Sequence, residues 1–460
     1  MFKNFHNGDS ARLPTPISGV KNGILGQVSQ SSSESDSRSA FWLNLKTRLH
    51  DALLDALNLS AIEKVGKSEL RREIANIVTE NLKDDDVSLN TSEFTRIVDE
   101  LMDEVIGLGP LEPLLKDDTI NDILVNTHAV IYVERYGRLE STSARFKDER
   151  HLLRIIDKIV SGVGRRIDES QPWVDARLAD GSRVNAMVAP CALDGPLLSI
   201  RKFSRQPFTI ERLVDAEAMP QAMAELLRGI VSARLNIVIS GGTGSGKTTM
   251  LNAVSTFIGR KERVITIEDA AELQLQQAHV VRMETRPPNI EGMGAVTQRD
   301  LVRNALRMRP DRIIVGEVRG AESLDMLQAM NTGHDGSMTT IHANSPRDAL
   351  GRIEQMIMMT GVDFPLKSMR GQISSAINVI LQLERLSDGK RRVISLSELT
   401  GMEGDVLTMQ EIFRYQKSGV DADGNVIGHF EATGIRPRFF ERLVAHGVEL
   451  PQQLFKPETA

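Results

Sequence analysis

The fold is decided by one stretch of the chain, Gly241-Gly242-Thr243-Gly244-Ser245-Gly246-Lys247-Thr248. It matches the phosphate-loop pattern G-x-x-x-x-G-K-[ST] at every position. The residues before it, 235–240, are typical of a buried strand, and those after it, 249–254, can open a helix. A strand that turns through glycines into a helix points several backbone N–H groups at one place, where the helix dipole adds positive charge. The stretch therefore predicts a nucleoside triphosphate site in an α/β fold.

Each residue type in this loop has a physical reason. Glycines let the backbone wrap a phosphate without steric conflict from a Cβ atom. We expect Lys247 to reach the β- and γ-phosphates and Thr248 to hold Mg²⁺. The alternative is a glycine-rich turn with a lysine there by chance. The predicted nucleotide-binding residues are Gly241, Gly242, Thr243, Gly244, Ser245, Gly246, Lys247, Thr248 and Thr249.

Length and composition are those of a multidomain globular protein. The chain has 460 residues, of which 41% are hydrophobic and 26% charged, and this length suits two to four domains. Its formal net charge of −6 gives no basic field, so nucleic acid is not expected as a partner. The single cysteine, Cys191, excludes an internal disulfide and argues against a cysteine-based metal site. Its uncharged surroundings suggest a small core residue.

The sequence offers no segment for direct insertion into a membrane. No uncharged apolar run approaches the roughly 18–20 residues that a membrane span needs. The N-terminal residues lack the apolar stretch of a signal peptide. We therefore expect a cytoplasmic protein that reaches the inner membrane only through partner proteins.

Periodicity and composition divide the chain into five parts. Residues 1–40 are polar and serine-rich and are predicted to be disordered. Three amphipathic segments within 41–106 predict a small helical bundle. Strand and helix patterns in 107–208 indicate an α+β domain, and 209–234 reads as a linker and leading helix. Alternating strands and helices in 235–460 predict a mostly parallel sheet.

Two carboxylates follow predicted strands of this sheet. Glu268 comes directly after an apolar run and is followed by Asp269. Carboxylates at the carboxyl end of a parallel strand face the ligand edge of an α/β sheet. Glu268 is therefore a candidate to polarise water or to hold Mg²⁺ through water, although a helix-capping role would also fit. Glu317 ends a second strand, with Gly316 where an acid most often holds the metal. Glu317 is the candidate to activate the attacking water.

A third cluster contains two histidines, His334 and His342, among glycines and hydroxyl residues. His342 could hydrogen-bond to the γ-phosphate, because histidine can donate in either protonation state. Alone, each histidine would more often be a local structural donor. Arg319 and Glu322 follow Glu317 on the next predicted helix, where we expect solvated or interfacial side chains.

Together these motifs resemble a known family. The phosphate loop, the Glu268-Asp269 box, the Gly316-Glu317 strand tip and the His334…His342 box occur in the order found in the secretion-superfamily ATPases that power type II secretion, type IV pili and type IV secretion. The segments 107–114 and 180–184 resemble the branch that serves Flp (tight-adherence) pili, of the CpaF type. The resemblance covers roughly residues 101–399.

The resemblance implies an architecture and a set of roles. The family forms ring-shaped hexamers, in which each protomer joins an α+β (PAS-like) N-terminal domain to a RecA-like motor domain. It implies that Arg183 and Arg201 reach the nucleotide phosphates from the N-terminal domain. ATP is then the substrate and Mg²⁺ the cofactor, held by Thr248 and, partly through water, by Glu268. Catalysis is assigned to Glu317, with help from Glu268, His342 and the two arginines.

The predicted function is a hexameric ATPase that powers Flp pilus assembly at the cytoplasmic face of the inner membrane. Expected partners are a homohexamer, inner-membrane platform proteins and possible cytoplasmic regulators of the N-terminal region. A type IV secretion or DNA-uptake ATPase of the same superfamily is the close alternative. A P-loop kinase lacks the paired histidines, and a non-enzymatic scaffold would not require Lys247, Thr248 and Glu317. An ABC-type ATPase is disfavoured because no Leu-Ser-Gly-Gly-Gln stretch precedes Glu317.

Overall fold

A computed structural model of the chain describes residues 66–84, 88–203, 209–289, 292–362 and 364–457, with isolated helical residues between 42 and 53. The expected N-terminal tail, residues 1–40, lies outside the described residues. The chain divides into two compact units, residues 1–113 and residues 114–460. Each unit is described by itself.

The first unit is helical. Its elements are α3 (Lys67–Asp84), α4 (Thr91–Val105) and the short 3₁₀ turn η1 (Gly109–Leu111), and α5 (Glu112–Lys116) follows across the unit boundary. Asn90 caps α4, because its side chain accepts from Glu93 N while the Glu93 side chain accepts from Asn90 N. One apolar core joins the residues Leu45, Leu49, Leu53, Leu70, Ile74, Val78, Leu82, Ile97, Val98 and Leu101.

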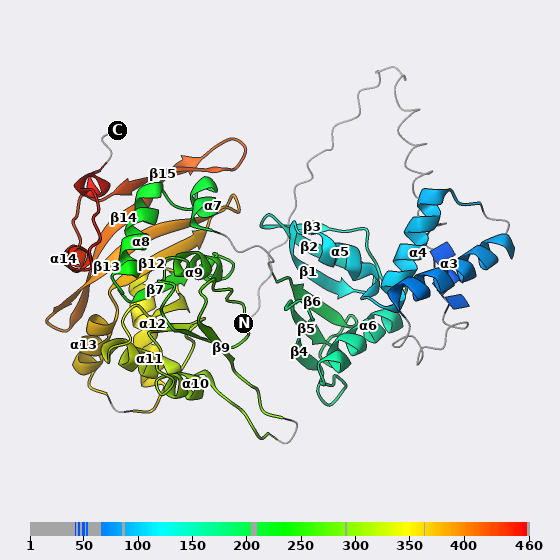
Figure 1. The fold of residues 1–460 in the computed structure, drawn as a ribbon, viewed down its shortest axis with the longest axis horizontal. Helices are drawn as coiled ribbons and strands as arrows, with labels where there is room; N and C mark the ends of the chain where they lie inside the picture. Colours follow the sequence, from blue (N-terminus) through cyan, green and yellow to red (C-terminus); the bar gives the residue numbers. More distant parts are fainter. Residues whose placement is uncertain are drawn as a thin grey trace, which may run out of the picture. The chain divides into compact units, whose positions relative to one another are not determined.

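The second unit begins with a small antiparallel sheet (Figure 1). Its strands are β1 (Ile120–Thr127), β2 (Val130–Arg135), β3 (Arg138–Ser141), β4 (Trp173–Arg177), β5 (Arg183–Met187) and β6 (Leu197–Arg201), in the order β3-β2-β1-β6-β5-β4. Helix α6 (Glu149–Gly162) contacts β4 and presents a buried apolar face. Asp148 caps this helix by accepting from His151 N.

The loop between β5 and β6 corrects one sequence prediction. Cys191 is exposed, so the expectation that it is a core residue is wrong. The uncharged run in which it lies includes a surface turn after the end of β5, and only Val188 and Ala192 of that turn are buried. An uncharged run therefore did not distinguish a strand from the turn that follows it.

The larger sheet of the second unit has nine strands. They are β7 (Ile237–Gly241), β8 (Val264–Glu268), β9 (Val280–Glu284), β10 (Arg312–Val315), β11 (Met338–His342), β12 (Val379–Arg385), β13 (Arg391–Glu403), β14 (Val406–Val420) and β15 (Val426–Ala432). The order is β15-β14-β13-β12-β7-β11-β10-β8-β9. The strands from β12 to β9 in this order run parallel, and β13, β14 and β15 extend the sheet antiparallel.

Helices cover both faces of this sheet, as expected for a RecA-like domain (Figure 1). Ile237 and Ile239 of β7 pack into one apolar core, and Val238 packs into the other. The first core includes residues of α7 (Ile210–Asp215), α8 (Gln221–Ser232), α9 (Lys247–Ser255), α14 (Phe440–Ala445) and the 3₁₀ helix η2 (Gln452–Phe455). The second includes residues of α10 (Gln298–Ala305), α11 (Glu322–Asn331), α12 (Pro346–Met358) and α13 (Leu366–Ala376).

The segment before the phosphate loop differs from the sequence prediction in one detail. A mostly helical stretch is divided into α7 and α8, because Glu217 takes a left-handed conformation at φ 56° and Pro220 precedes the second helix.

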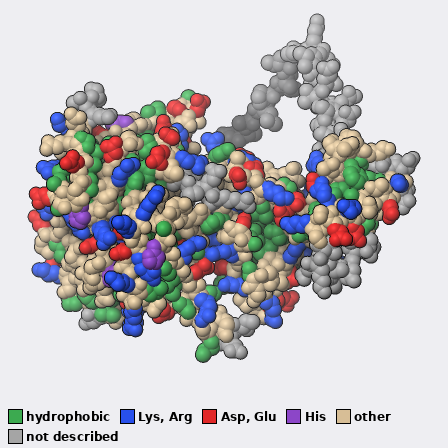
Figure 2. All heavy atoms as spheres, viewed as in Figure 1, with side chains coloured by type: hydrophobic (Ala, Val, Ile, Leu, Met, Phe, Trp, Pro, Cys, Tyr) green, Lys and Arg blue, Asp and Glu red, His purple; other side chains and the backbone are tan. Residues whose placement is uncertain are grey.

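The surface carries interspersed charges: on the face shown in Figure 2, basic and acidic side chains are mixed over the described residues. The visible face is therefore not a single broad basic surface.

Candidate functional site

The phosphate loop connects β7 to α9 and lies between neighbouring parallel strands. Gly244 and Gly246 have φ values of 69° and 93°, which favour glycine. A Cβ atom on Gly241 would collide with the Ser245 side chain and with the carbonyl oxygen of Leu383. The loop can therefore keep this path only with glycine at these positions, and Thr248 and Thr249 follow in the first turn of α9.

Lys247 is buried at the centre of the loop. Its Nζ donates to the carbonyl oxygens of Gly241 at 3.1 Å and Gly242 at 2.9 Å. The same atom lies 3.3 Å from His342 Nε2. Burial lowers the pKa of Lys247, although the charge of Glu317 opposes that shift. A buried ammonium group whose charge is costly is suited to bind an anion.

A chain of charged side chains crosses the carboxyl edge of the parallel sheet. Glu317 Oε1 lies 2.9 Å from His342 Nε2, and its Oε2 accepts from Arg319 Nη2 at 2.7 Å. Arg319 Nη1 continues to Asp269 Oδ2 at 3.5 Å. Burial, and then the charge of Lys247, lowers the pKa of His342. Lys247 can donate only to an unprotonated ring nitrogen of a neutral His342, and Glu317 Oε1 is buried without a hydrogen bond among the described residues.

Glu268 has a different environment from Glu317. Its Oε1 accepts from the backbone N–H groups of Glu272 at 2.7 Å and Leu273 at 2.8 Å, and so shapes the loop after β8. Its Oε2 is buried with no hydrogen-bond partner in the described part of the chain. Burial raises the pKa of Glu268, although the two backbone hydrogen bonds oppose this.

Gly316 is explained by Glu268. A Cβ atom on Gly316 would lie 2.9 Å from Cγ of Glu268, closer than side chains approach. The glycine therefore makes room for the neighbouring carboxylate where many P-loop proteins have a metal-binding acid. Sequence reasoning recognised the missing acid but not this packing, because the two residues belong to different strands.

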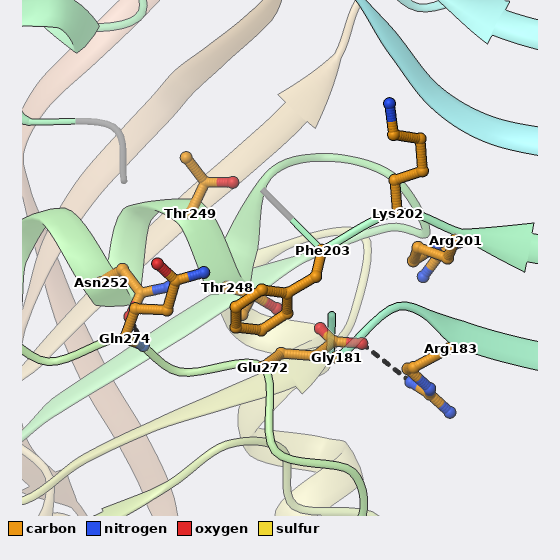
Figure 3. Close-up of a pocket in the computed structure, with 10 residues that line it drawn as sticks. All are labelled: Gly181, Arg183, Arg201, Lys202, Phe203, Thr248, Thr249, Asn252, Glu272 and Gln274. Atoms are coloured by element: carbon orange, nitrogen blue, oxygen red, sulfur yellow. Dashed lines mark hydrogen bonds and ion pairs between the residues drawn. The ribbon is translucent and has the colours of Figure 1, made fainter. Parts of the chain in front are cut away.

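The predicted arginines come from the small sheet and face the domain of the nine-stranded sheet across a cavity (Figure 3). Arg183 Nη1 donates to Glu272 Oε1 at 2.9 Å, and Arg201 Nε donates to Asp122 Oδ1 at 3.2 Å. The cavity is about 170 Å³ and is lined by Gly181, Arg183, Arg201, Lys202, Phe203, Thr248, Thr249, Asn252, Glu272 and Gln274. Both arginines thus share one cavity with the start of α9.

A tight turn positions Arg183. Asp180 accepts from Ser182 N and from Ser182 Oγ, each at 2.9 Å, and Gly181 between them has a φ of 94°. Ser182 Oγ in turn accepts from Phe203 N at 3.0 Å. A Cβ atom on Gly181 would press against the Phe203 ring. The sequence segment 180–184 therefore fixes where two lining residues of the cavity lie.

One expectation about the residues after Glu317 needs correction. Arg319 is exposed, as expected, although it precedes α11 and also pairs with Glu317. Glu322 was expected to be solvated or interfacial, but it is buried and accepts from the backbone N–H groups of Arg319 at 2.6 Å and Gly320 at 2.7 Å. An acid three residues after an unpaired N–H can cap a helix start, and this signal was available in the sequence.

The two histidines are separated by the length of β11. His342 ends that strand beside Glu317, whereas His334 lies before its start and contacts the carbonyl oxygen of Ala329 at 3.3 Å. Only His342 therefore belongs to the candidate site.

Among the described residues, no group of three or more His, Cys, Asp or Glu side chains could hold a metal ion by itself. In the same residues, no helix is both long and apolar enough to cross a membrane.

Comparison with known proteins gives the family. The profile of the family described as type II/IV secretion system protein matches residues 104–426. Conjugal transfer protein TrbB of Rhizobium radiobacter is 32% identical over 280 residues, covering 60% of this chain and 83% of its own. Type IV secretion system protein PtlH of Bordetella pertussis is 33% identical over 318 residues, covering 63% and 93%. A protein of Mycobacterium tuberculosis H37Rv that carries the provisional name of a conjugal transfer protein is 40% identical over 312 residues, covering 66% of this chain and 88% of its own.

Solved structures include similar proteins. The VirB11 ATPase of the Brucella suis type IV secretion system, in complex with sulphate, is 28% identical with a TM-score of 0.34, covering 62% of this chain and 91% of its own. The pilus retraction motor PilT with bound ADP is 23% identical with a TM-score of 0.45, covering 62% and 80%. On the family match over most of its length, the chain belongs to the family of type II/IV secretion system proteins.

Proposed function

We propose that this protein is an ATP-hydrolysing motor of a pilus-assembly or secretion machine. The observation that carries the proposal is one cavity that brings Arg183 and Arg201 of the small sheet opposite Thr248 at the start of α9. A guanidinium pair that faces a phosphate loop suits charge that develops on a transferred phosphoryl group. The reaction is cleavage of ATP by water to ADP and phosphate.

The proposed roles follow from the contacts of each side chain. The backbone N–H groups of the loop and Lys247 bind the β- and γ-phosphates. Glu317 accepts the proton of the attacking water, since its two oxygens lie at the strand tip beside His342 and Arg319. His342 can donate to the γ-phosphate from the same edge.

Thr248 and Glu268 are the residues that fit a magnesium ion. Glu268 Oε2 is buried and unpaired within the described residues, which suits a hydrogen bond to metal-bound water. When bound, Mg²⁺ would withdraw charge from the β- and γ-phosphate oxygens. The hydroxyl of Thr248 is the direct ligand in this proposal, and Glu268 orients water around it.

We place the motor in a homohexameric ring at the cytoplasmic face of the inner membrane, where it acts on platform proteins and has no need of nucleic acid. A neighbouring protomer in a ring can hold the small domain against the cavity. The segments 107–114 and 180–184 favour the Flp pilus branch. The names of the relatives TrbB and PtlH instead favour conjugal transfer or type IV secretion, which is the second candidate.

Phosphate release from Mg-ATP, without any acceptor substrate, tests the enzymatic proposal. Arg201→Ala should lower turnover more than nucleotide affinity, and Arg201→Lys should rescue only in part because the planar fork is lost. Light scattering with a non-hydrolysable ATP analogue should show a hexamer, and specific activity should rise with protein concentration. A fully active monomer would contradict the ring mechanism. Unchanged turnover in Arg201→Ala would contradict this role of Arg201.

A deletion strain separates the two biological candidates. Loss of surface filaments with normal DNA or protein transfer would support the Flp assignment. Loss of transfer with normal filaments would support the second candidate. Complementation with wild type and with Glu317→Gln shows whether the phenotype depends on hydrolysis.

A further inference from the structure

One row of charged residues crosses the small sheet. In the register of the strands, Glu134 on β2 lies opposite Asp122 on β1, which lies opposite Arg201 on β6. Arg201 in turn lies opposite Arg183 on β5, and Arg183 lies opposite Arg177 on β4. Directly opposed residues share a face of a sheet, so two acids and three arginines form one continuous row. Adjacent arginines repel one another, and the row therefore needs anionic partners.

The motor domain supplies charges of the opposite sign along this row. Glu272 pairs with Arg183 at 2.9 Å, and Glu284 pairs with Arg177 through two hydrogen bonds of 3.1 and 3.2 Å. At the acidic end of the row, Arg391 Nη2 donates to Glu134 Oε1 at 3.3 Å. The small sheet thus meets the motor domain through complementary charges at both ends of the row.

Arg391 also contacts the phosphate loop. Its Nε donates to the carbonyl oxygen of Gly244 at 2.8 Å, while its Nη2 contacts Glu134. Arg391 is the first residue of β13, next to the loop, and a Cβ atom on Gly246 would touch its Cδ at 3.4 Å. A single guanidinium therefore joins the nucleotide-binding loop to the row that carries Arg183 and Arg201.

We infer that Arg391 is a positioning residue that couples the phosphate loop to the small domain, so that a phosphate-bound loop holds Arg183 and Arg201 in line with the γ-phosphate. A guanidinium can serve both acceptors because its N–H groups diverge in one rigid plane. An ammonium group on a flexible stem can satisfy the carboxylate or the carbonyl but does not fix the angle between them. The inference rests on the proposed ATPase function and adds a residue that the sequence motifs did not mark.

Steady-state kinetics of the full chain test the coupling. Arg391→Gln should lower kcat about tenfold while KM and the Kd for a fluorescent ATP analogue change less than about threefold, because Lys247 and the loop N–H groups remain. Arg391→Lys should recover part of kcat. Lys390→Gln is the matched control: it removes the neighbouring cation, which makes an exposed 3.2 Å pair with Glu217. A Lys390→Gln loss equal to that of Arg391→Gln would overturn the inference.

A double-mutant cycle separates coupling from a local effect on the loop. Glu134→Ala and Arg391→Ala should each reduce kcat, and the double variant should be no slower than the worse single variant. Strictly multiplicative effects would show that Arg391 acts on the loop alone, which contradicts the inference. Circular dichroism and melting curves confirm that each variant is folded.

A distance measurement keeps the inference testable if the wild type does not hydrolyse ATP. The single cysteine, Cys191, is exposed on the small domain and accepts a spin label. A second label at Asp423→Cys, on the turn between β14 and β15 of the motor domain, completes the pair. Labelled protein diluted with unlabelled protein should show a distance change with the ATP analogue, and Arg391→Gln should broaden the distribution and lose the response. An unchanged response in Arg391→Gln would refute the coupling, whatever the outcome for hydrolysis.

Discussion

The two ends of β10 both carry charged clusters, and the two clusters behave in opposite ways. Arg312 begins this strand and is only 1% exposed, whereas Glu317 lies just beyond its end, in the candidate site. At the amino end every charge has a fixed partner. At the carboxyl end the charges share partners and several are destabilised by burial. The comparison separates a cluster that holds the domain together from one that is suited to bind a ligand.

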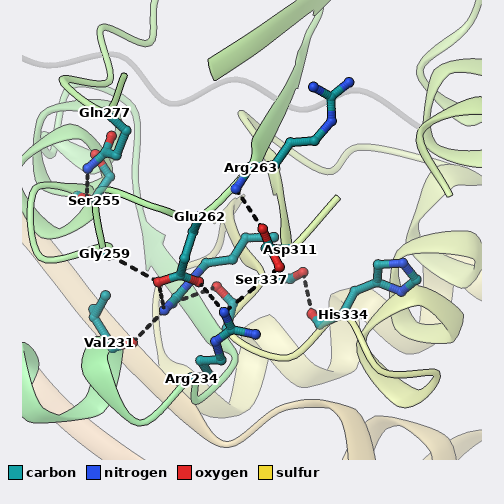
Figure 4. A network of polar contacts seen from close by, with 12 residues as sticks. Val231, Arg234, Ser255, Gly259, Glu262, Arg263, Gln277, Asp311, His334 and Ser337 are labelled. Carbon is teal, nitrogen blue, oxygen red and sulfur yellow. Dashed lines mark hydrogen bonds and ion pairs between the residues drawn. The ribbon is translucent and has the colours of Figure 1, made fainter. Parts of the chain in front are cut away.

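The amino-end cluster is saturated (Figure 4). Glu262 accepts from Arg312 Nε at 2.8 Å and Nη2 at 3.0 Å, and it also pairs with Arg234 at 2.9 Å. Arg312 Nη2 donates further to the carbonyl oxygen of Val231 at 2.8 Å, at the end of α8. Burial alone would raise the pKa of Glu262, but the hydrogen bond and charge of Arg312 hold it below its ordinary value. The ionised form is therefore favoured by folding.

The carboxyl-end cluster shows the reverse pattern. Burial lowers the pKa of Lys247 and raises that of Glu268, so both charged forms are disfavoured. His342 Nε2 lies near both Lys247 and Glu317, and cannot satisfy the two equally. A polyphosphate with its metal would supply the charges that these groups lack. Incomplete internal pairing is thus the feature that distinguishes the site from the structural cluster.

The largest expected effect is on stability at the amino end. Arg312→Met leaves Glu262 buried without its main partner, and breaking a buried pair costs about 3–5 kcal/mol. Denaturant unfolding should show this loss, while phosphate release per folded molecule at low temperature stays close to wild type. Arg312→Met/Glu262→Met should recover part of the stability. A single variant as stable as wild type would contradict the role of this pair.

The next effect is on catalysis at the other end of the same strand. Glu317→Gln should keep nucleotide binding but reduce turnover about 10²-fold or more, because the amide cannot accept the proton of water. Binding of a fluorescent ATP analogue and phosphate release measure the two properties separately. Its unfolding free energy should change by less than about 1 kcal/mol, in contrast to Arg312→Met. Wild-type turnover in this variant would remove Glu317 from the base role.

Lys247→Met tests whether the site trades stability for binding. The change removes a buried charge and keeps the aliphatic stem, so the stability without nucleotide should stay within about 1 kcal/mol of wild type. Wild type should gain about 2.7 kcal/mol at 100 times the Kd for Mg-ATP, and the variant should lose this gain. Thermal melts with and without Mg-ATP measure both. A normal ATP-dependent gain in the variant would argue against Lys247 as a phosphate ligand.

The smallest expected effect is a pH dependence at the amino end. Because folding lowers the pKa of Glu262 from 4.5, its charge stabilises the protein above about pH 4.5, and the contribution is lost as the pH falls through the lowered value. Because the amide oxygen of Gln can still accept from Arg312, Glu262→Gln should lose less stability than Arg312→Met, about 1 kcal/mol at pH 7, and the difference from wild type should shrink below pH 4.5. A difference that does not change with pH would show that the charge of Glu262 contributes nothing.

Several features of this protein were determined by the sequence alone. The sequence of the loop Gly241–Thr248 predicts its backbone path, because the turn needs glycines and the lysine at fixed spacing. Glu268, Glu317 and His342 could be assigned to one edge, since the carboxyl ends of parallel strands meet there. The mostly parallel sheet followed from the alternation of strands and helices, and the RecA-like fold followed from the resemblance of the motifs to a known family.

Only the tertiary structure distinguished the roles of similar residues. Arg312, Arg319 and Arg391 all lie at or near strand ends, yet one is a buried structural ion, one binds the candidate base, and one contacts the phosphate loop. The need for glycine at position 316 is clear only from the structure, where a Cβ atom there would collide with the Glu268 side chain. The physical reason is that the role of a charged side chain depends on the groups it contacts. Glu262 contacts Arg312, and Glu134 and Gly244 contact Arg391, and these partners come from segments that are far away in the chain and adjacent only after folding.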